Sequence, residues 1–183
     1  MRSAILFSAL AGVVLGHGGP TGALGNAKTT TNADNIMYHG SLSSDTVTGS
    51  IDIVAGPAGN GLSYSLKLTK APTNVGALSY YIATSSVKVG ASCDALGGVF
   101  DPYVRGADPV CETDDPATCR VGDLSGKYGT LRVTSTGTGT KSFSDFYTSS
   151  TIGDFAFVGN RSIVISDSTN KAHACANFLR MEM

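Results

Sequence analysis

Tryptophan is absent from this chain, histidine occurs only three times, and charged residues make up 15% of its 183 positions. The formal net charge is −1, and the 13 lysines and arginines form no basic stripe. Nucleic acid is therefore not an expected partner, because phosphate binding requires clustered cationic side chains. Three histidines also leave little imidazole from which a transition-metal centre could be built.

Long hydrophobic runs are absent too, except for one near the N-terminus. An arginine precedes the apolar run Ala4–Leu15, and Val14 and Gly16 are small enough for the −3 and −1 positions of a cleavage site. This 12-residue run is too short to span a bilayer core. The sequence predicts a signal peptide over residues 1–16 and a secreted, extracellular chain. The last six residues lack a glycolipid-anchor pattern, so we expect no membrane attachment after cleavage.

Apolar residues alternate with polar ones in many short segments that end at glycine, asparagine or aspartate. Residues 62–69 show the clearest alternation, which is typical of a half-buried β-strand. Further strands are expected at 36–42, 47–53, 78–82, 131–135, 141–147, 162–166 and 172–178. No convincing internal helix is present. The pattern favours a flexible N-terminal arm over 17–32 and one all-β Greek-key sandwich or barrel over 33–183.

Four cysteines in a chain predicted to be secreted indicate two disulfides, for which three pairings exist. Three of these cysteines lie in the long irregular region 85–130, which is therefore expected to be stapled. Proximity alone favours a bond between Cys111 and Cys119. The sequence Asn160-Arg161-Ser162 is an N-glycosylation sequon, so Asn160 is a candidate glycan acceptor.

The segment Gly-Asp-Leu-Ser-Gly-Lys at residues 122–127 is by itself a polar turn. With its neighbours it resembles a loop of the copper/zinc superoxide dismutases, especially the secreted copper-only branch of fungal cell surfaces. Other segments that resemble this family, in the same order, are Leu78–Ala83, Phe100–Tyr103, and Gly159–Asp167 leading to Ala174–Phe178.

This resemblance covers roughly residues 33 to 179 and implies an eight-stranded Greek-key β-barrel with a long disulfide-stapled loop. It selects the disulfides Cys93–Cys175 and Cys111–Cys119. Gly122, Asp123 and Gly126 would then belong to a structural loop. In the family the aspartate hydrogen-bonds a copper-ligand histidine. Here we expect it to accept backbone N–H bonds near residues 125–127 or to pair with Arg120.

The resemblance does not include the copper ligands. In the family, four histidines bind copper, and the matching positions here are Tyr81, Ala83, Val99 and Ser166. The arginine that guides superoxide is replaced by Ala172, and a glutamate of the copper-only branch by Arg120. Alanine and valine bind no metal, and phenol and hydroxyl groups are poor substitutes for imidazole around copper. We therefore predict no catalytic residue and no cofactor, with copper as the alternative.

None of the three histidines of the chain stands at a copper-ligand position of the family. His39 should lie at the surface of the first strand. His173, two positions before Cys175, should hydrogen-bond within the sandwich or lie at the former active-site rim. Cleavage after Gly16 would make His17 the mature N-terminus, where its amino group and imidazole could bind copper weakly.

The sequence thus predicts a secreted superoxide-dismutase-like scaffold that has lost catalysis and has a structural or binding role. Its partner would be an unknown extracellular molecule or a cell-wall component, and the protein a monomer or homodimer. Tyr80, Tyr81 and Tyr103 are the candidate binding surface. The alternatives are a copper-dependent superoxide dismutase with an unconventional site, converting superoxide to oxygen and hydrogen peroxide, and copper binding at His17.

Overall fold

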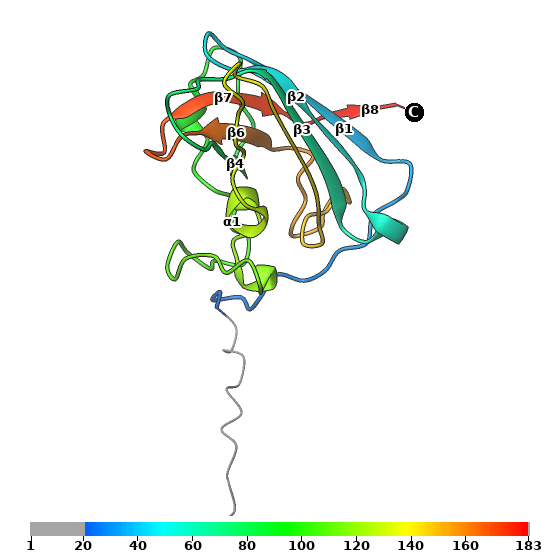
Figure 1. Ribbon diagram of the computed structural model, residues 1–183. Helices are drawn as coiled ribbons and strands as arrows, with labels where there is room; N and C mark the ends of the chain where they lie inside the picture. The colour runs from blue at the N-terminus through cyan, green and yellow to red at the C-terminus, as the bar shows by residue number, and fades with distance from the viewer. Residues whose placement is uncertain (1–20, 183) are drawn as a thin grey trace, which may run out of the picture.

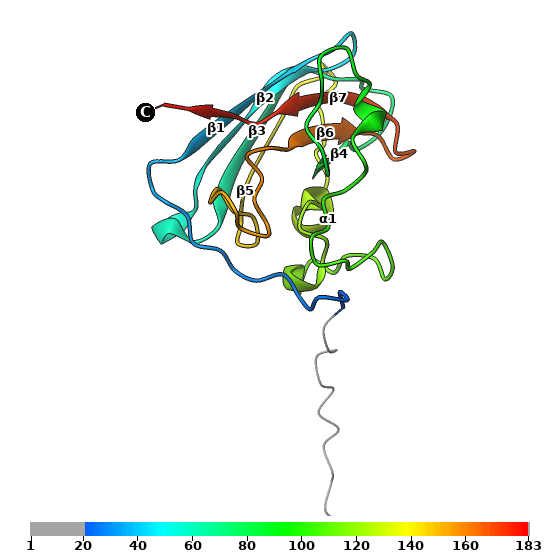
Figure 2. The same ribbon diagram turned by 180° about the vertical axis from the view of Figure 1, so that it is seen from behind.

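The computed structural model describes residues 21–182. The predicted signal peptide and His17 lie outside these described residues. Eight strands form two antiparallel sheets that pack against each other, and the short helix α1 lies next to β4 (Figures 1 and 2). The predicted all-β sandwich is therefore confirmed.

The larger sheet has five strands in the order β5-β3-β2-β1-β8, and the smaller has three in the order β4-β6-β7. The strand bounds are β1 Met37–Ser43, β2 Thr48–Ala55, β3 Leu62–Lys70, β4 Ser79–Ile82, β5 Gly139–Asp145, β6 Ser162–Ser166, β7 Ala172–Asn177 and β8 Leu179–Met181.

The register of the larger sheet follows directly from the alternation in the sequence. Ile51 lies opposite Leu66, and Ile53 opposite Tyr64, so every second side chain of β2 and β3 enters the core. All four of these side chains are at most 2% exposed. A register shift of one residue would turn this whole set to solvent, so the hydrophobic pattern fixes the pairing.

The end of the chain connects the two sheets. β7 pairs with β6 of the smaller sheet, and after Phe178 the chain continues as β8, which pairs with β1 of the larger sheet. At the opposite edge, an isolated bridge joins Leu78 to Leu131. The chain thus links the two sheets on one side, and on the other the bridge ties the start of β4 to the segment that leads into β5.

Two local expectations were wrong. Residues 131–135 form no strand beyond the single bridge of Leu131, because the hydroxyls of Thr134, Thr136 and Thr138 bond to one another in a tight turn. Such local bonds compete with a strand ladder. The segment after Gly122 is also more than a turn, since it contains the helix α1, Leu124–Tyr128. Among the described residues, no helix is long and apolar enough to cross a membrane.

The part of the expected N-terminal arm that the structure describes, residues 21–32, makes hydrogen bonds with the rest of the protein. Ala27 donates its N–H to Ala117 O at 2.8 Å, and the hydroxyl of Thr30 donates to Thr148 O at 2.6 Å. The Asn32 side chain is 5% exposed and bonds to Gly61 O and to the N–H of Ser150. Buried hydrogen bonds hold this polar segment in place. A pattern of alternating apolar and polar residues does not reveal such bonds.

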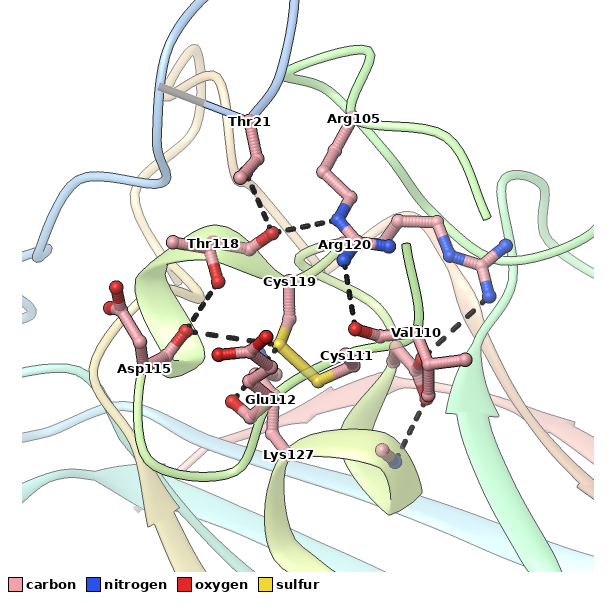
Figure 3. The surroundings of a disulfide bond; sticks show 12 residues. Thr21, Arg105, Val110, Cys111, Glu112, Asp115, Thr118, Cys119, Arg120 and Lys127 are labelled. Atoms are coloured by element: carbon pink, nitrogen blue, oxygen red, sulfur yellow. Dashed lines mark hydrogen bonds and ion pairs between the residues drawn. A yellow bond between two sulfur atoms is a disulfide. The ribbon is translucent and has the colours of Figure 1, made fainter. Parts of the chain in front are cut away.

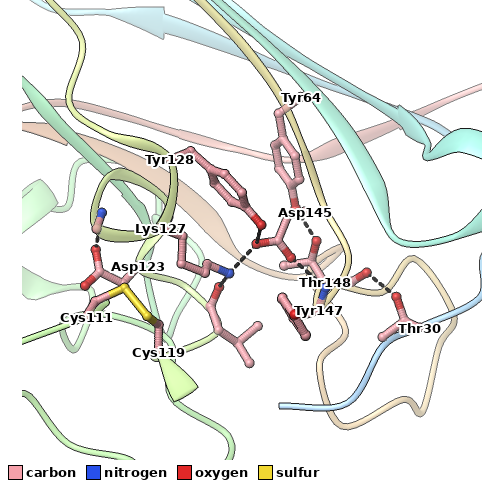
Figure 4. Close-up of polar contacts among 12 residues, drawn as sticks. Thr30, Tyr64, Cys111, Cys119, Asp123, Lys127, Tyr128, Asp145, Tyr147 and Thr148 are labelled. Atoms are coloured by element: carbon pink, nitrogen blue, oxygen red, sulfur yellow. Dashed lines mark hydrogen bonds and ion pairs between the residues drawn. A yellow bond between two sulfur atoms is a disulfide. The ribbon is translucent and has the colours of Figure 1, made fainter. Parts of the chain in front are cut away.

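A buried ion pair joins α1 to the end of β5. Lys127 Nζ pairs with Asp145 Oδ2, and both side chains are 0% exposed (Figure 4). Lys127 also donates to Val121 O at 2.9 Å, while the Tyr128 hydroxyl and the Tyr147 N–H donate to the carboxylate at 3.0 and 2.8 Å. Burial, and next the Asp145 charge, raise the pKa of Tyr128, so its phenol keeps the donated proton.

Removing the charge of Asp145 should therefore destabilise the fold strongly. Asp145→Asn leaves the Lys127 ammonium buried without a counter-ion, for which we expect a loss of about 3–5 kcal/mol in the free energy of unfolding. Urea unfolding followed by circular dichroism measures this loss. The control is Asp94→Asn on the exposed loop, expected to cost less than about 0.5 kcal/mol. Equal stability of the two variants would contradict the role given to the pair.

Candidate functional site

The four positions that match the copper ligands come together on the outer face of the smaller sheet. Tyr81 lies opposite Val164 of β6, and Ser166 is two residues further along β6 on the same face. Ala83 follows β4 and forms a bridge with Val99 of the long loop. The fold therefore gathers the residues expected from the sequence, although their side chains are not those of a copper centre.

An apolar cluster occupies this face. Ala83 and Val164 are 0% exposed and Leu96 is 3% exposed. Packed against them are Tyr81, Val87, Ala172 and Cys175. The long loop thereby covers the outer face of β6, and all five residues of this strand are buried although only one of its faces looks into the sandwich.

The residues present do not fit copper. Two of the four positions carry only hydrocarbon, and the other two offer a phenol and a hydroxyl. Burial, and next the nearby Asp94 carboxylate, raise the pKa of Tyr81, which makes its phenolate harder to form. Among residues 21–182 no three His, Cys, Asp or Glu side chains are grouped so that they could hold a metal ion.

Both predicted disulfides are present. Cys93–Cys175 ties the long loop to β7 across a sequence separation of 82 residues, and Cys111–Cys119 closes a small ring ahead of α1 (Figure 3). The first bond lies beside the apolar cluster, so it holds the covering loop against the sheet. Closing a loop of this length contributes about 4.5 kcal/mol in the chain-entropy model.

Arg105 supports the small ring, and sequence reasoning did not single it out. Its guanidinium is buried and donates to three backbone carbonyls, those of Thr118 at 2.8 Å, Gly106 at 3.1 Å and Val110 at 3.2 Å. Figure 3 shows this side chain reaching toward the segment that carries the disulfide. Arg105 thus donates hydrogen bonds to loop carbonyls that lie outside the β-sheets.

Asp123 has the structural role expected for it. Its Oδ1 accepts the N–H of Gly126 at 2.9 Å and so caps α1, and its Oδ2 lies 3.6 Å from Nη2 of Arg120. A Cβ at position 126 would lie 2.6 Å from this carboxylate, and one at Gly122 would lie 2.5 Å from Ile82 O. Both glycines are therefore required by close packing around the cap.

The two described histidines each pair with an aspartate. His173 Nε2 lies 2.9 Å from Asp167 Oδ2, with side chains only 7% and 8% exposed, and Asp167 directly follows Ser166 in the sequence. This agrees with the expected hydrogen bond of His173. His39 is a half-exposed residue of β1, as expected, and its Nδ1 lies 2.7 Å from Asp52 Oδ1.

The predicted tyrosine surface is wrong. Tyr80 is 0% exposed and points into the sandwich, where its hydroxyl donates to Gly129 O. Tyr81 faces the other way, because neighbouring residues of a strand alternate between its faces. Tyr103 is 8% exposed and packs edge-on against Phe155. The three rings share no face.

The sheet arrangement and the loop carrying the disulfides define a superoxide-dismutase-type sandwich. The structure of Candida albicans superoxide dismutase 5 in its Cu(II) form superposes with a TM-score of 0.71, covering 81% of this chain and 94% of that one at 22% identity. No protein-family model matches the chain.

In sequence, 105 residues are 40% identical to a cell-surface Cu-only superoxide dismutase of Arthroderma benhamiae, covering 57% of this chain and 28% of that protein. A separate comparison over 127 residues gives 31% identity to cell-surface superoxide dismutase 4 (Cu-Zn) of Candida albicans, covering 69% of this chain and 52% of that protein. The expected resemblance is confirmed: the chain is a homologue of fungal cell-surface superoxide dismutases. It spans between about a quarter and half of the length of these relatives.

The Asp167 carboxylate makes the stability of the fold depend on pH. The hydroxyl of Thr169, and next His173, lower the pKa of Asp167 far below its usual range. A carboxyl group with a lowered pKa in the folded state stabilises the fold above its unfolded pKa of about 3.9, and this contribution is lost as the pH falls through the folded value.

We therefore expect Asp167→Asn to be less stable than the parent at pH 7, with a difference that shrinks as the pH falls below about 4. Thr169→Val keeps the Asp167 carboxylate but removes the hydroxyl that donates to it. As the pH falls, this variant should therefore lose stability at a higher pH than the parent does. Thermal unfolding between pH 2 and 7 measures both effects. A difference between Asp167→Asn and the parent that stays constant over this range would refute the linkage.

Proposed function

We propose that this chain is a secreted superoxide-dismutase-like scaffold that does not dismutate superoxide and has a structural or binding role outside the cell. One observation carries the proposal. Tyr81, Ala83, Val99 and Ser166 replace the copper ligands, and the face on which they lie is packed with aliphatic side chains. Dismutation requires a copper that is held in both oxidation states, and these groups do not supply such a site.

The charges around this face support the same proposal. Superoxide is an anion, and a positive channel raises its rate of encounter. Ala172 stands where the guiding arginine of the family is expected, and it packs in the apolar cluster instead. Arg120 stands where the copper-only branch has a glutamate, and it pairs with Asp123. Neither position therefore carries the charge that the family pattern predicts.

Secretion is supported by three observations of different kinds. The relatives are cell-surface proteins by name, both disulfides are formed, and Asn160 of the sequon is exposed in a turn before β6. Disulfides of this kind persist in oxidising compartments. The binding partner would be an extracellular molecule or a cell-wall component, met by a monomer or homodimer.

The second candidate function is a copper-dependent superoxide dismutase with an unconventional site. The names of the relatives favour it, since one is a Cu-only and another a Cu-Zn enzyme. It would require ligands other than the four family positions. Copper binding at His17, which lies outside the described residues, is a separate alternative. Metal content distinguishes the two functions.

We expect the purified protein to retain less than stoichiometric copper after dialysis and to show no superoxide removal above free copper. Copper loading followed by elemental analysis and a superoxide assay is the measurement. A variant with Tyr81→His, Ala83→His, Val99→His and Ser166→His, together with Leu96→Ala to make room beside Ala83, should bind one copper ion. Leu96→Ala alone is the matched control and should bind none. Tight stoichiometric copper with rapid dismutation in the parent would establish the second candidate instead.

Expression in a eukaryotic secretory host should attach an N-glycan at Asn160, because the side chain is exposed and the sequon is intact. Intact mass before and after endoglycosidase treatment should differ by the mass of the glycan, and Asn160→Gln should abolish the difference. A secreted parent whose mass the enzyme leaves unchanged would show that the sequon is unused.

A further inference from the structure

The outer face of the five-stranded sheet carries a cluster that the proposed function does not use. His39 of β1 lies directly opposite Asp52 of β2. Ser41 lies two residues after His39 and therefore on the same face. All three side chains are accessible, with His39 33% and Asp52 42% exposed.

The hydrogen bonds connect these groups in one line. His39 Nδ1 lies 2.7 Å from Asp52 Oδ1, and His39 Nε2 lies 3.0 Å from Ser41 Oγ. A carboxylate only accepts hydrogen bonds, so the neutral ring is assigned its proton on Nδ1, which leaves the Nε2 lone pair for the serine hydroxyl. A carboxylate on Nδ1 and a hydroxyl on Nε2 is the connectivity of serine hydrolases.

We propose that Ser41, His39 and Asp52 form a second site that hydrolyses carboxylic esters. Ser41 Oγ attacks the ester carbonyl carbon while its proton passes to His39 Nε2. The alcohol leaves with that proton, and Ser41 carries the acyl group. Water then attacks this acyl ester, gives a proton to His39, and releases the acid as Ser41 regains its hydrogen. Asp52 acts as a positioning residue that fixes the tautomer of His39.

Two neighbouring side chains suit the negative oxygen that forms in this reaction. Ser50 lies opposite Ser41, and Lys67 of β3 lies opposite Ser50 on the same face. β2 pairs with both β1 and β3 over residues 48–54, so its backbone N–H groups are engaged in the sheet, and we assign the stabilising charge to side chains. The hydroxyl of Ser50 and the ammonium of Lys67 are the groups in position.

The substrate class follows from the apolar residues on the other side of His39. Leu179 of β8 lies opposite His39, and Met37 lies between Val54 and Met181 in the next row of the sheet. Leu179, Met181 and Val54 are 62%, 43% and 41% exposed. They form an open apolar strip without an enclosing wall, which suits a short aliphatic acyl chain and leaves the size of the alcohol unrestricted.

The first test locates the nucleophile in the unchanged protein. An alkyl fluorophosphonate, which traps activated serines, should modify Ser41 in preference to Ser43 and Ser50, as read by peptide mass mapping. A label spread equally over these serines, or absent from all of them, overturns the proposal whatever the variants do.

The second test follows hydrolysis of p-nitrophenyl butyrate. Ser41→Ala and His39→Gln should lower kcat/KM by about 100-fold. Asp52→Asn should lower kcat and leave KM unchanged, which a purely structural change would not do. The matched control is Ser43→Ala, on the same strand and face but outside the relay, and it should keep the parent rate. Hydrolysis that survives Ser41→Ala unchanged would arise from the imidazole alone and would refute the serine mechanism.

Discussion

The buried pair of Lys127 and Asp145 is the interaction on which the arrangement of the loops depends. It joins α1, which follows the small disulfide ring, to the last residue of β5 in the larger sheet. Figure 4 shows a second group of hydrogen bonds beside this pair, in which Thr148 accepts from the hydroxyls of Tyr64 of β3 and Thr30 of the N-terminal segment. The desolvated charge pair joins α1 to the end of β5, and the bonds of Thr148 attach β3 and the N-terminal segment beside it. The cost of burying these charges is offset only while every partner is in place.

The face that carries Tyr81, Ala83 and Ser166 is held together by different forces from those of a metal centre. In a copper protein, ligands from two strands and a loop are joined through the ion. Here the same positions are joined by contacts among Ala83, Leu96 and Val164 and by the disulfide Cys93–Cys175. Hydrophobic burial and a covalent link need no metal, so the long loop is fixed to the sheet in its absence.

The two outer faces of the sandwich consequently differ in what they can do. The smaller sheet is covered by its loop, and its side chains are occupied in packing. The larger sheet leaves His39, Asp52 and Ser41 exposed in a hydrogen-bonded line beside an apolar strip. Chemistry that needs an accessible nucleophile is therefore favoured on the larger sheet. The strands that carry the family resemblance, β4, β6 and β7, form the smaller sheet.

The sequence by itself determined the strands with clean alternation, such as β3, because their register is fixed by a period of two. It also determined the two disulfides and the cap at Asp123, through local motifs and the family resemblance. The tertiary structure alone decided that residues 131–135 leave the sheet, that β8 joins β1, and that residues 27–32 are bound rather than free. It also decided that His39 meets Asp52 across two strands. Each of these depends on contacts between distant segments, whose partners no local pattern in the chain identifies.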